Sequence, residues 1–109
     1  MPHCIIEHSD DFNSSILVEA VFKGALTSRL FESQDIKVRA QPFSHYQVGF
    51  KRSAFIHVTL RMMSGRGYEQ KVNLVQSVVE QLKGLNYDEV SITTEIQEID
   101  ERTYCKQLV

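Results

Sequence analysis

The sequence has few of the residue types that mark specialised protein classes. Among 109 residues there are no Trp, two Pro, two Cys and five Gly. Two cysteines are too few for a disulfide scaffold, and so little Pro and Gly excludes a collagen-like or low-complexity chain. No stretch approaches ~18 consecutive apolar residues, which predicts that no segment spans a membrane. The N-terminal residues have neither a basic segment nor an apolar core, so we expect a cytoplasmic protein without a signal peptide.

An excess of either charge is also missing. Lys and Arg number 12 and Asp and Glu 14, which gives a net charge of −2, and the sequence pI is about 6.1. This balance gives no general attraction to nucleic acids or anionic membranes, so neither is expected as a partner. What the sequence does have is 42% hydrophobic and 24% charged residues, the usual composition of a globular protein. The length predicts one domain over residues 1–109.

Apolar patterning predicts six regular elements in the order β-α-β-β-α-β. Apolar runs or alternation predict strands over residues 3–8, 36–40, 54–62 and 89–99. Apolar residues at helical spacing predict helices over residues 16–31 and 68–85. Pro42 should end the second strand or mark a sheet edge. Two segments stay open: residues 44–52 as an irregular loop or a short strand, and residues 104–109 as a terminal strand or an arm.

The two halves of this order look like a structural duplication. Each helix has one apolar stripe, which predicts an α+β fold with a four-stranded mixed sheet and both helices on one face. The opposite sheet face would then be half apolar and uncovered in a monomer. We therefore expect this face to be buried against other copies of the chain.

Pro2 is the first candidate for chemistry. Removal of Met1, which is usual before a small second residue, would leave a secondary amine at the start of a strand. A free α-amino group has a pKa of about 7.7–8.0, and burial near cations would lower it toward that of a general base at neutral pH. A proline at this position is, however, also a common terminal residue. With Met1 attached the nitrogen is an amide and cannot act as a base.

Three cationic residues are candidates for anion binding. Lys37 and Arg39 lie two apart on one predicted strand and point the same way. Arg66 lies in a Ser-Gly-Arg-Gly run between a strand and a helix N-terminus, where free N–H groups and the helix dipole favour an anion. Arginine can hold a carboxylate through two hydrogen bonds. The alternative is that all three are solvated surface charges.

The histidines give a weaker signal. His57 alternates with Phe55 and Thr59 on the best-patterned strand, where it could contact a substrate or be a sheet residue without a catalytic role. His3, His8 and His45 have no metal-ligand spacing with one another or with the cysteines, so no metal site is expected. The cysteines lack a neighbour that would mark either as a nucleophile.

Two segments of the sequence are similar to a known family. The opening Met-Pro-His-Cys-Ile-Ile-Glu-His-Ser-Asp resembles the start of 5-carboxymethyl-2-hydroxymuconate isomerases, which are members of the tautomerase superfamily. Residues 54–61, Ala-Phe-Ile-His-Val-Thr-Leu-Arg, followed by Ser-Gly-Arg-Gly-Tyr-Glu at 64–69, resemble that family's third strand and the loop into its second helix. The resemblance is good over residues 2–10 and 54–83.

The resemblance implies a tautomerase fold and a cofactor-independent isomerase that assembles as a homotrimer. Pro2 would be the general acid and base for an unsaturated 2-oxo or 2-hydroxy carboxylic acid. Arg66 matches the family's loop arginine and would bind the substrate. Where the family has Ile-Arg-X-Arg, this chain has Lys37 and Arg39. Arg39 matches one arginine and would be the catalytic group, with Lys37 as a substrate contact. The alternative is that Lys37 replaces the catalytic arginine, in which case the planar fork is lost and the substrate differs. His57, from its place on the best-patterned strand, is a further substrate-binding candidate.

Two other interpretations remain. One is a non-catalytic, trimeric member of the tautomerase superfamily, which retention of Met1 would favour. The other is a ferredoxin-like binding module, because its element order is the same. An RNA-binding version would need a basic face and stacking aromatics on its central strands. The acidic pI and the lone Phe55 on its strand disfavour it.

Overall fold

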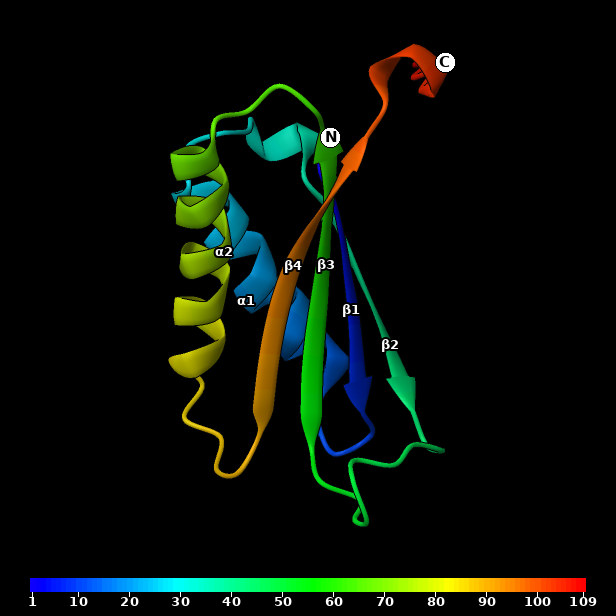
Figure 1. The fold of residues 1–109 in the computed structure, drawn as a ribbon, viewed down its shortest axis with the longest axis vertical. Helices are drawn as coiled ribbons and strands as arrows, with labels where there is room; N and C mark the ends of the chain where they lie inside the picture. Colours follow the sequence, from blue (N-terminus) through cyan, green and yellow to red (C-terminus); the bar gives the residue numbers. More distant parts are fainter.

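The computed structural model describes residues 1–109 and contains one sheet, two long helices and two short 3-10 helices (Figure 1). The four strands are β1 (His3–Ser9), β2 (Lys37–Phe43), β3 (Phe55–Met63) and β4 (Ser91–Ile99). The helices are α1 (Ser14–Thr27) and α2 (Tyr68–Lys83). The 3-10 helices are η1 (Ser33–Asp35) and η2 (Glu101–Thr103). The predicted β-α-β-β-α-β order is confirmed.

The sheet has the strand order β2-β1-β3-β4. β1 is parallel to β2 and β3 is parallel to β4, whereas the central strands β1 and β3 are antiparallel. The two halves repeat in detail. The Lys37 amide donates to the Pro2 carbonyl at 3.1 Å, and the Ser91 amide donates to the Ala54 carbonyl at 3.1 Å. The mixed sheet is therefore built from two equivalent parallel pairs.

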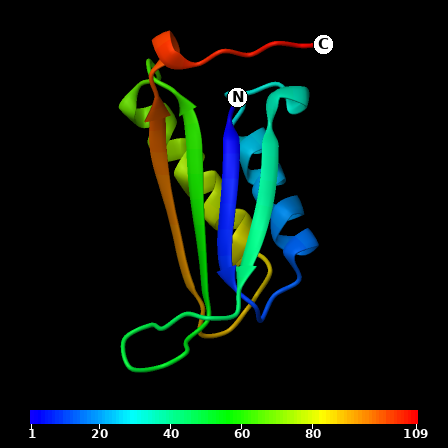
Figure 2. The same cartoon turned by 90° about the vertical axis from the view of Figure 1, so that its right-hand side faces the viewer.

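Both helices cover the same face of the sheet, and the hydrophobic core lies between the two layers (Figures 1 and 2). Alternate strand residues enter this core because side chains on a strand point to opposite faces. The helices approach closely at Gly24 of α1. A Cβ atom there would lie 2.7 Å from the Cα of Val78 on α2, so only glycine fits this helix crossing. The Ser77 hydroxyl also donates to the Gly24 carbonyl at 2.7 Å.

Two element ends differ from the predicted ones by three or more residues. Helix α1 ends at Thr27 rather than at residue 31, because the backbone turns at Arg29, whose φ of 63° is left-handed. Strand β2 continues past Pro42 to Phe43. Proline is tolerated there because β2 is an edge strand, with only β1 beside it. Residues 44–52 form a loop with a single isolated bridge between Val48 and Lys51.

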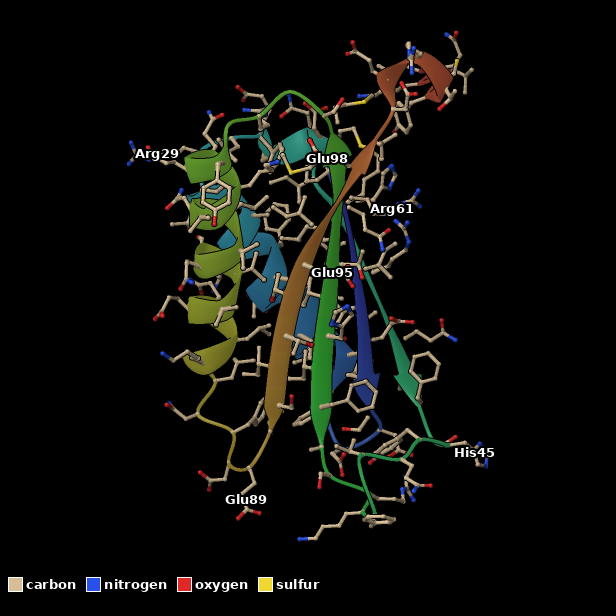
Figure 3. The ribbon with its side chains drawn as sticks, viewed as in Figure 1. Arg29, His45, Arg61, Glu89, Glu95 and Glu98 are labelled. Atoms are coloured by element: carbon tan, nitrogen blue, oxygen red, sulfur yellow. The ribbon has the colours of Figure 1, made fainter.

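The sheet face opposite the helices, which we call the open face, is mostly polar. The expectation of a half-apolar open face is wrong, because most apolar strand residues point toward the helices. The apolar side chains of this face are Ile5, Phe43, Phe55, Met63 and Ile99. They are outnumbered by polar and charged ones, namely His3, Glu7, Lys37, Arg39, Gln41, His57, Thr59, Arg61, Ser91, Thr93, Glu95 and Gln97. Figure 3 shows Arg61 pointing away from the helices on this side.

After η2 the chain continues as an arm, residues 104–109, rather than as a strand. The arm runs across the end of the sheet where β1 and β2 begin (Figure 2). The end of the sheet that holds the N-terminus is thus bordered by the arm, by η1 and by the loop between β3 and α2.

Neither helix is long and apolar enough to cross a bilayer.

Candidate functional site

Pro2 is fully buried at the start of the central strand β1. The Met1 amine next to it donates to the Asp35 carbonyl at 3.1 Å. The pKa of this amine is lowered from its usual 8.0, first by desolvation and then by the positive charge of Lys37. An amino group at this end of the sheet is therefore less basic than a free terminus in water.

Lys37 and Arg39 lie on the open face of β2, beside the start of β1. The Lys37 Nζ donates to the Asp35 carbonyl at 3.3 Å. Arg39 Nη1 donates to His3 Nδ1 at 3.2 Å. Desolvation, followed by the charge of Arg39, lowers the pKa of His3 below 6.5. Because Arg39 can only donate, His3 accepts at Nδ1 and carries its proton on Nε2, which donates to the Tyr104 oxygen at 3.2 Å.

Arg66 lies at the same end of the molecule, in the loop between β3 and α2. Its Nη2 donates to the Leu30 carbonyl at 2.9 Å, and its guanidinium lies 5.4 Å from the centre of the Phe31 ring. These contacts hold the half-buried Arg66 at the wall of a cavity of about 280 Å³, whose other lining residues include Met1, Phe31, Met62 and Met63. Arg66 and the N-terminal residue thus face one partly apolar cavity.

His57 lies elsewhere on the open face. It pairs with Glu7, four residues along β1 from His3, which at ~3.3 Å per residue is roughly 13 Å. Its Nε2 donates to Glu95 at 2.7 Å, and its Nδ1 lies 2.7 Å from the Thr93 hydroxyl. Figure 3 shows Glu95 near the middle of the sheet. The structure therefore gathers Pro2, Lys37, Arg39 and Arg66 at one end and leaves His57 outside that group.

Three residues at the N-terminal end, Asp35, Tyr104 and Lys106, were not predicted from the sequence. Lys106 Nζ lies 3.3 Å from Asp35 Oδ1. These contacts join residues 71 or more positions apart, so no local pattern could have shown them. The one available signal was the cluster of polar residues after β4, which did not indicate the direction of the arm.

Three other features of the structure, namely its potential metal ligands, Cys4 and a second hollow, do not form a candidate site. No group of three or more His, Cys, Asp or Glu side chains is arranged to hold a metal ion. Burial raises the pKa of the Cys4 thiol to about 12, so Cys4 is unsuited to act as a nucleophile. A larger hollow of about 400 Å³ between α2 and β4 is lined by residues such as Tyr68, Val72 and Ile96, and contains none of the predicted site residues.

The duplicated β-α-β sheet places the chain in the fold class of the tautomerases and macrophage migration inhibitory factor. A crystal structure of 5-carboxymethyl-2-hydroxymuconate delta-isomerase matches with a TM-score of 0.82 and 19% identity, covering 100% of this chain and 89% of that chain. A 5-carboxymethyl-2-hydroxymuconate isomerase from Deinococcus radiodurans R1 gives 0.80 and 24%, covering 97% and 88%. A fused 4-OT symmetric trimer gives 0.74 and 16%, covering 96% and 93%.

The family follows from the sequence itself. A model of the 5-carboxymethyl-2-hydroxymuconate isomerase family matches residues 2–108, and the chain belongs to this family. No curated protein sequence matches the chain. The resemblance predicted from the sequence and the predicted fold class are both confirmed.

Proposed function

We propose that the chain is an isomerase of the tautomerase type, which moves a proton along an unsaturated 2-oxo or 2-hydroxy carboxylic or dicarboxylic acid without a cofactor. Membership of an isomerase family supports the reaction class. The observation that carries the proposal is the position of Pro2, buried at the start of β1, at the end of the sheet that also holds Lys37, Arg39 and Arg66. The activity requires removal of Met1, because only then is the Pro2 nitrogen an amine.

The base in this proposal is the neutral Pro2 amine. Desolvation and Lys37 already lower the pKa of the Met1 amine. After removal of Met1, the Pro2 nitrogen would be the terminal amine at the same end of the sheet, where desolvation and the charge of Lys37 would lower its pKa in the same direction. A lowered pKa leaves the amine unprotonated near neutral pH, ready to take a proton from the carbon next to a carbonyl. The protonated amine then returns the proton to another carbon of the conjugated system.

The cations have separate roles. Arg39, with Lys37 beside it, would stabilise the negative charge that develops on the dienolate oxygen when the proton leaves. Arg66 would bind a more distant carboxylate and thereby fix which carbon faces Pro2. His57, expected from the sequence to contact substrate, is left out of this proposal because its ring lies farther along the sheet and bonds to Glu95.

The proposal is tested with Pro2→Ala in an ultraviolet assay on 2-hydroxymuconate. We expect the rate to fall by about 10²–10⁴-fold, the range typical for loss of a positioned general base. Ser91→Ala is the matched control, because Ser91 is the counterpart of Lys37 in the other half and should not affect the rate. Equal rates for Pro2→Ala and the unmodified protein would refute the role of Pro2. Intact-mass analysis of protein from its own host shows whether Met1 is removed.

Retention of Met1 would instead favour a non-catalytic member of the superfamily. This alternative has some support, because the Met1 amine has a hydrogen-bond partner of its own at Asp35 and Met1 lines the cavity. Intact-mass analysis, together with the ultraviolet assay on 2-hydroxymuconate, distinguishes the catalytic isomerase from the non-catalytic member.

We also infer that the chain forms a homotrimer. The fused 4-OT of the same fold is a symmetric trimer, and here strands β2 and β4 are both free sheet edges that could pair with another copy. Multi-angle light scattering at micromolar concentration should give three times the mass of one chain. A stable monomer there would contradict the inference.

A further inference from the structure

The arm is held against the N-terminal end of the sheet. Arg102 forms a bidentate pair with Asp100, with nitrogen–oxygen distances of 3.1 and 2.9 Å, where the chain turns after β4. The arm then crosses the sheet end (Figure 2). The Tyr104 ring lies edge-on to the ring of His3, with 6.4 Å between the centroids, and the two groups are hydrogen-bonded. The arm is thus positioned by contacts at the residue that follows Pro2.

The next part of the arm brings a further cation to this end. Lys106 Nζ lies 3.3 Å from Asp35 Oδ1. The carbonyl of the same Asp35 accepts from the Met1 amine at 3.1 Å and from Lys37 Nζ at 3.3 Å. Without Met1, as the proposed activity requires, the ammonium groups of Lys37 and Lys106 still converge on a residue with a single carboxylate. The local excess of positive charge favours an anion.

The ion pair between Asp35 and Lys106 is exposed and weak. The side chains are 43% exposed for Lys106 and 37% exposed for Asp35, and ion pairs exposed to this extent contribute little to stability. A carboxylate of a ligand could therefore take the place of the Asp35 carboxylate on Lys106 at small cost. The arm lies next to the N-terminal amine, close enough for the charge of Lys106 to contribute to its lowered pKa.

We propose that Lys106 is a specificity-determining residue that binds one carboxylate of a dianionic substrate, and that Tyr104 positions it through His3. Arg66, on the other side of the N-terminus, would hold the second carboxylate. The inference rests on the proposed function and adds the arm to the site. It makes Asp35 a competitor of the substrate for Lys106.

The test compares two ligands with the same six-carbon diene, muconate with two carboxylates and sorbate with one. Neither has the 2-hydroxy group, so binding is measured by calorimetry without turnover, on protein whose N-terminus has been determined. Lys106→Gln should weaken muconate binding by about fivefold and change sorbate binding by less than about twofold. Lys106→Arg should keep muconate binding. The matched control Lys83→Gln removes an exposed lysine of α2 that pairs with Glu80 and should change neither.

Asp35→Asn provides a test in the opposite direction. Without its competitor, Lys106 should bind muconate about twofold to fivefold more tightly, and this gain should vanish in Asp35→Asn/Lys106→Gln. Unchanged muconate binding in Lys106→Gln, an equal loss for both ligands, or no muconate binding to the unmodified protein would overturn the inference. Failure of the proposed function is a different result, because it appears as an undiminished rate in Pro2→Ala.

Discussion

The two halves of the molecule share a backbone arrangement but differ in chemistry. Pro2 and Lys37 are joined by the same 3.1 Å hydrogen bond as Ala54 and Ser91 in the second half. The next residue on the open face is Arg39 in the first half, whereas the second half has a threonine, Thr93. The duplication therefore supplies two equivalent strand starts, and the side chains confine the candidate site to one of them.

The electrostatic environments differ in the same way. At the first-half strand start, Lys37 donates to the Asp35 carbonyl, Lys106 of the arm pairs with the Asp35 carboxylate, and Arg39 bonds to His3. At the equivalent place of the second half, His57 bonds to Glu95 and Thr93, so the histidine has both ring nitrogens occupied. An organic anion would be attracted to the first environment and repelled by the Glu95 carboxylate in the second. The comparison shows how one fold can carry a site at one end only.

Among the variants that test this comparison, the largest effect should come from Arg39→Thr, which gives the first half the residue that the second half has at this position. Loss of a group that stabilises a developing oxyanion typically lowers turnover by about 10²–10³-fold. Steady-state kinetics on 2-hydroxymuconate should show this mainly in kcat. The converse variant Thr93→Arg should gain no activity, because no terminal proline lies beside it. Unaltered turnover in Arg39→Thr would shift the oxyanion role to Lys37.

A smaller effect is expected where the helices of the two halves meet. Gly24→Ala would place a methyl group 2.7 Å from the Val78 Cα, which is backbone and cannot move aside easily. We expect a loss of about 1–3 kcal/mol in the free energy of unfolding, measured by urea denaturation. Gly84→Ala is the control, because its nearest neighbours would lie at 3.4 Å or more. Equal stabilities of the two variants would mean that the helices separate without penalty.

The smallest effect concerns His3, which bonds to Arg39 in the first half. Its pKa is lowered below 6.5 in the folded protein, so at pH values between that lowered pKa and 6.5 the unfolded chain binds more protons. The free energy of unfolding should therefore decrease as the pH drops below about 6.5. The slope of this decrease should correspond to the uptake of less than one proton per molecule on unfolding. His3→Gln should flatten this part of the pH profile of thermal unfolding. His45→Gln, in the loop after β2, should leave it unaltered, and a steeper profile for His3→Gln would contradict the lowered pKa.

Local patterning predicted most of the fold. The alternation over residues 54–62 predicted β3, and helical spacing from Tyr68 predicted α2, because each pattern follows directly from which face is buried. The end of α1 was not predicted, since Leu30 and Phe31 keep an apolar spacing after the backbone has already turned at Arg29. Apolar spacing shows which residues are buried but not where the backbone changes direction, so the C-terminal end of α1 could not be predicted from it.

The candidate site was predicted in part. Pro2 and Arg66 were predicted because each lies at a recognisable strand or helix terminus, and Lys37 and Arg39 because they share one face of a predicted strand. The pairing of His57 with Glu95 depends on the register between β3 and β4, which no local pattern fixes. The contribution of the arm depends on where the chain goes after η2, and this is determined by contacts with distant residues.

The contrast between the two cysteines has a practical consequence. Cys4 is buried in the core with a thiol pKa of about 12, whereas Cys105 is exposed on the arm between Tyr104 and Lys106. A maleimide fluorophore will therefore label the folded protein at Cys105 alone, without any engineered cysteine. Its emission would then report directly on whether the arm stays in place or lifts when an organic acid is added.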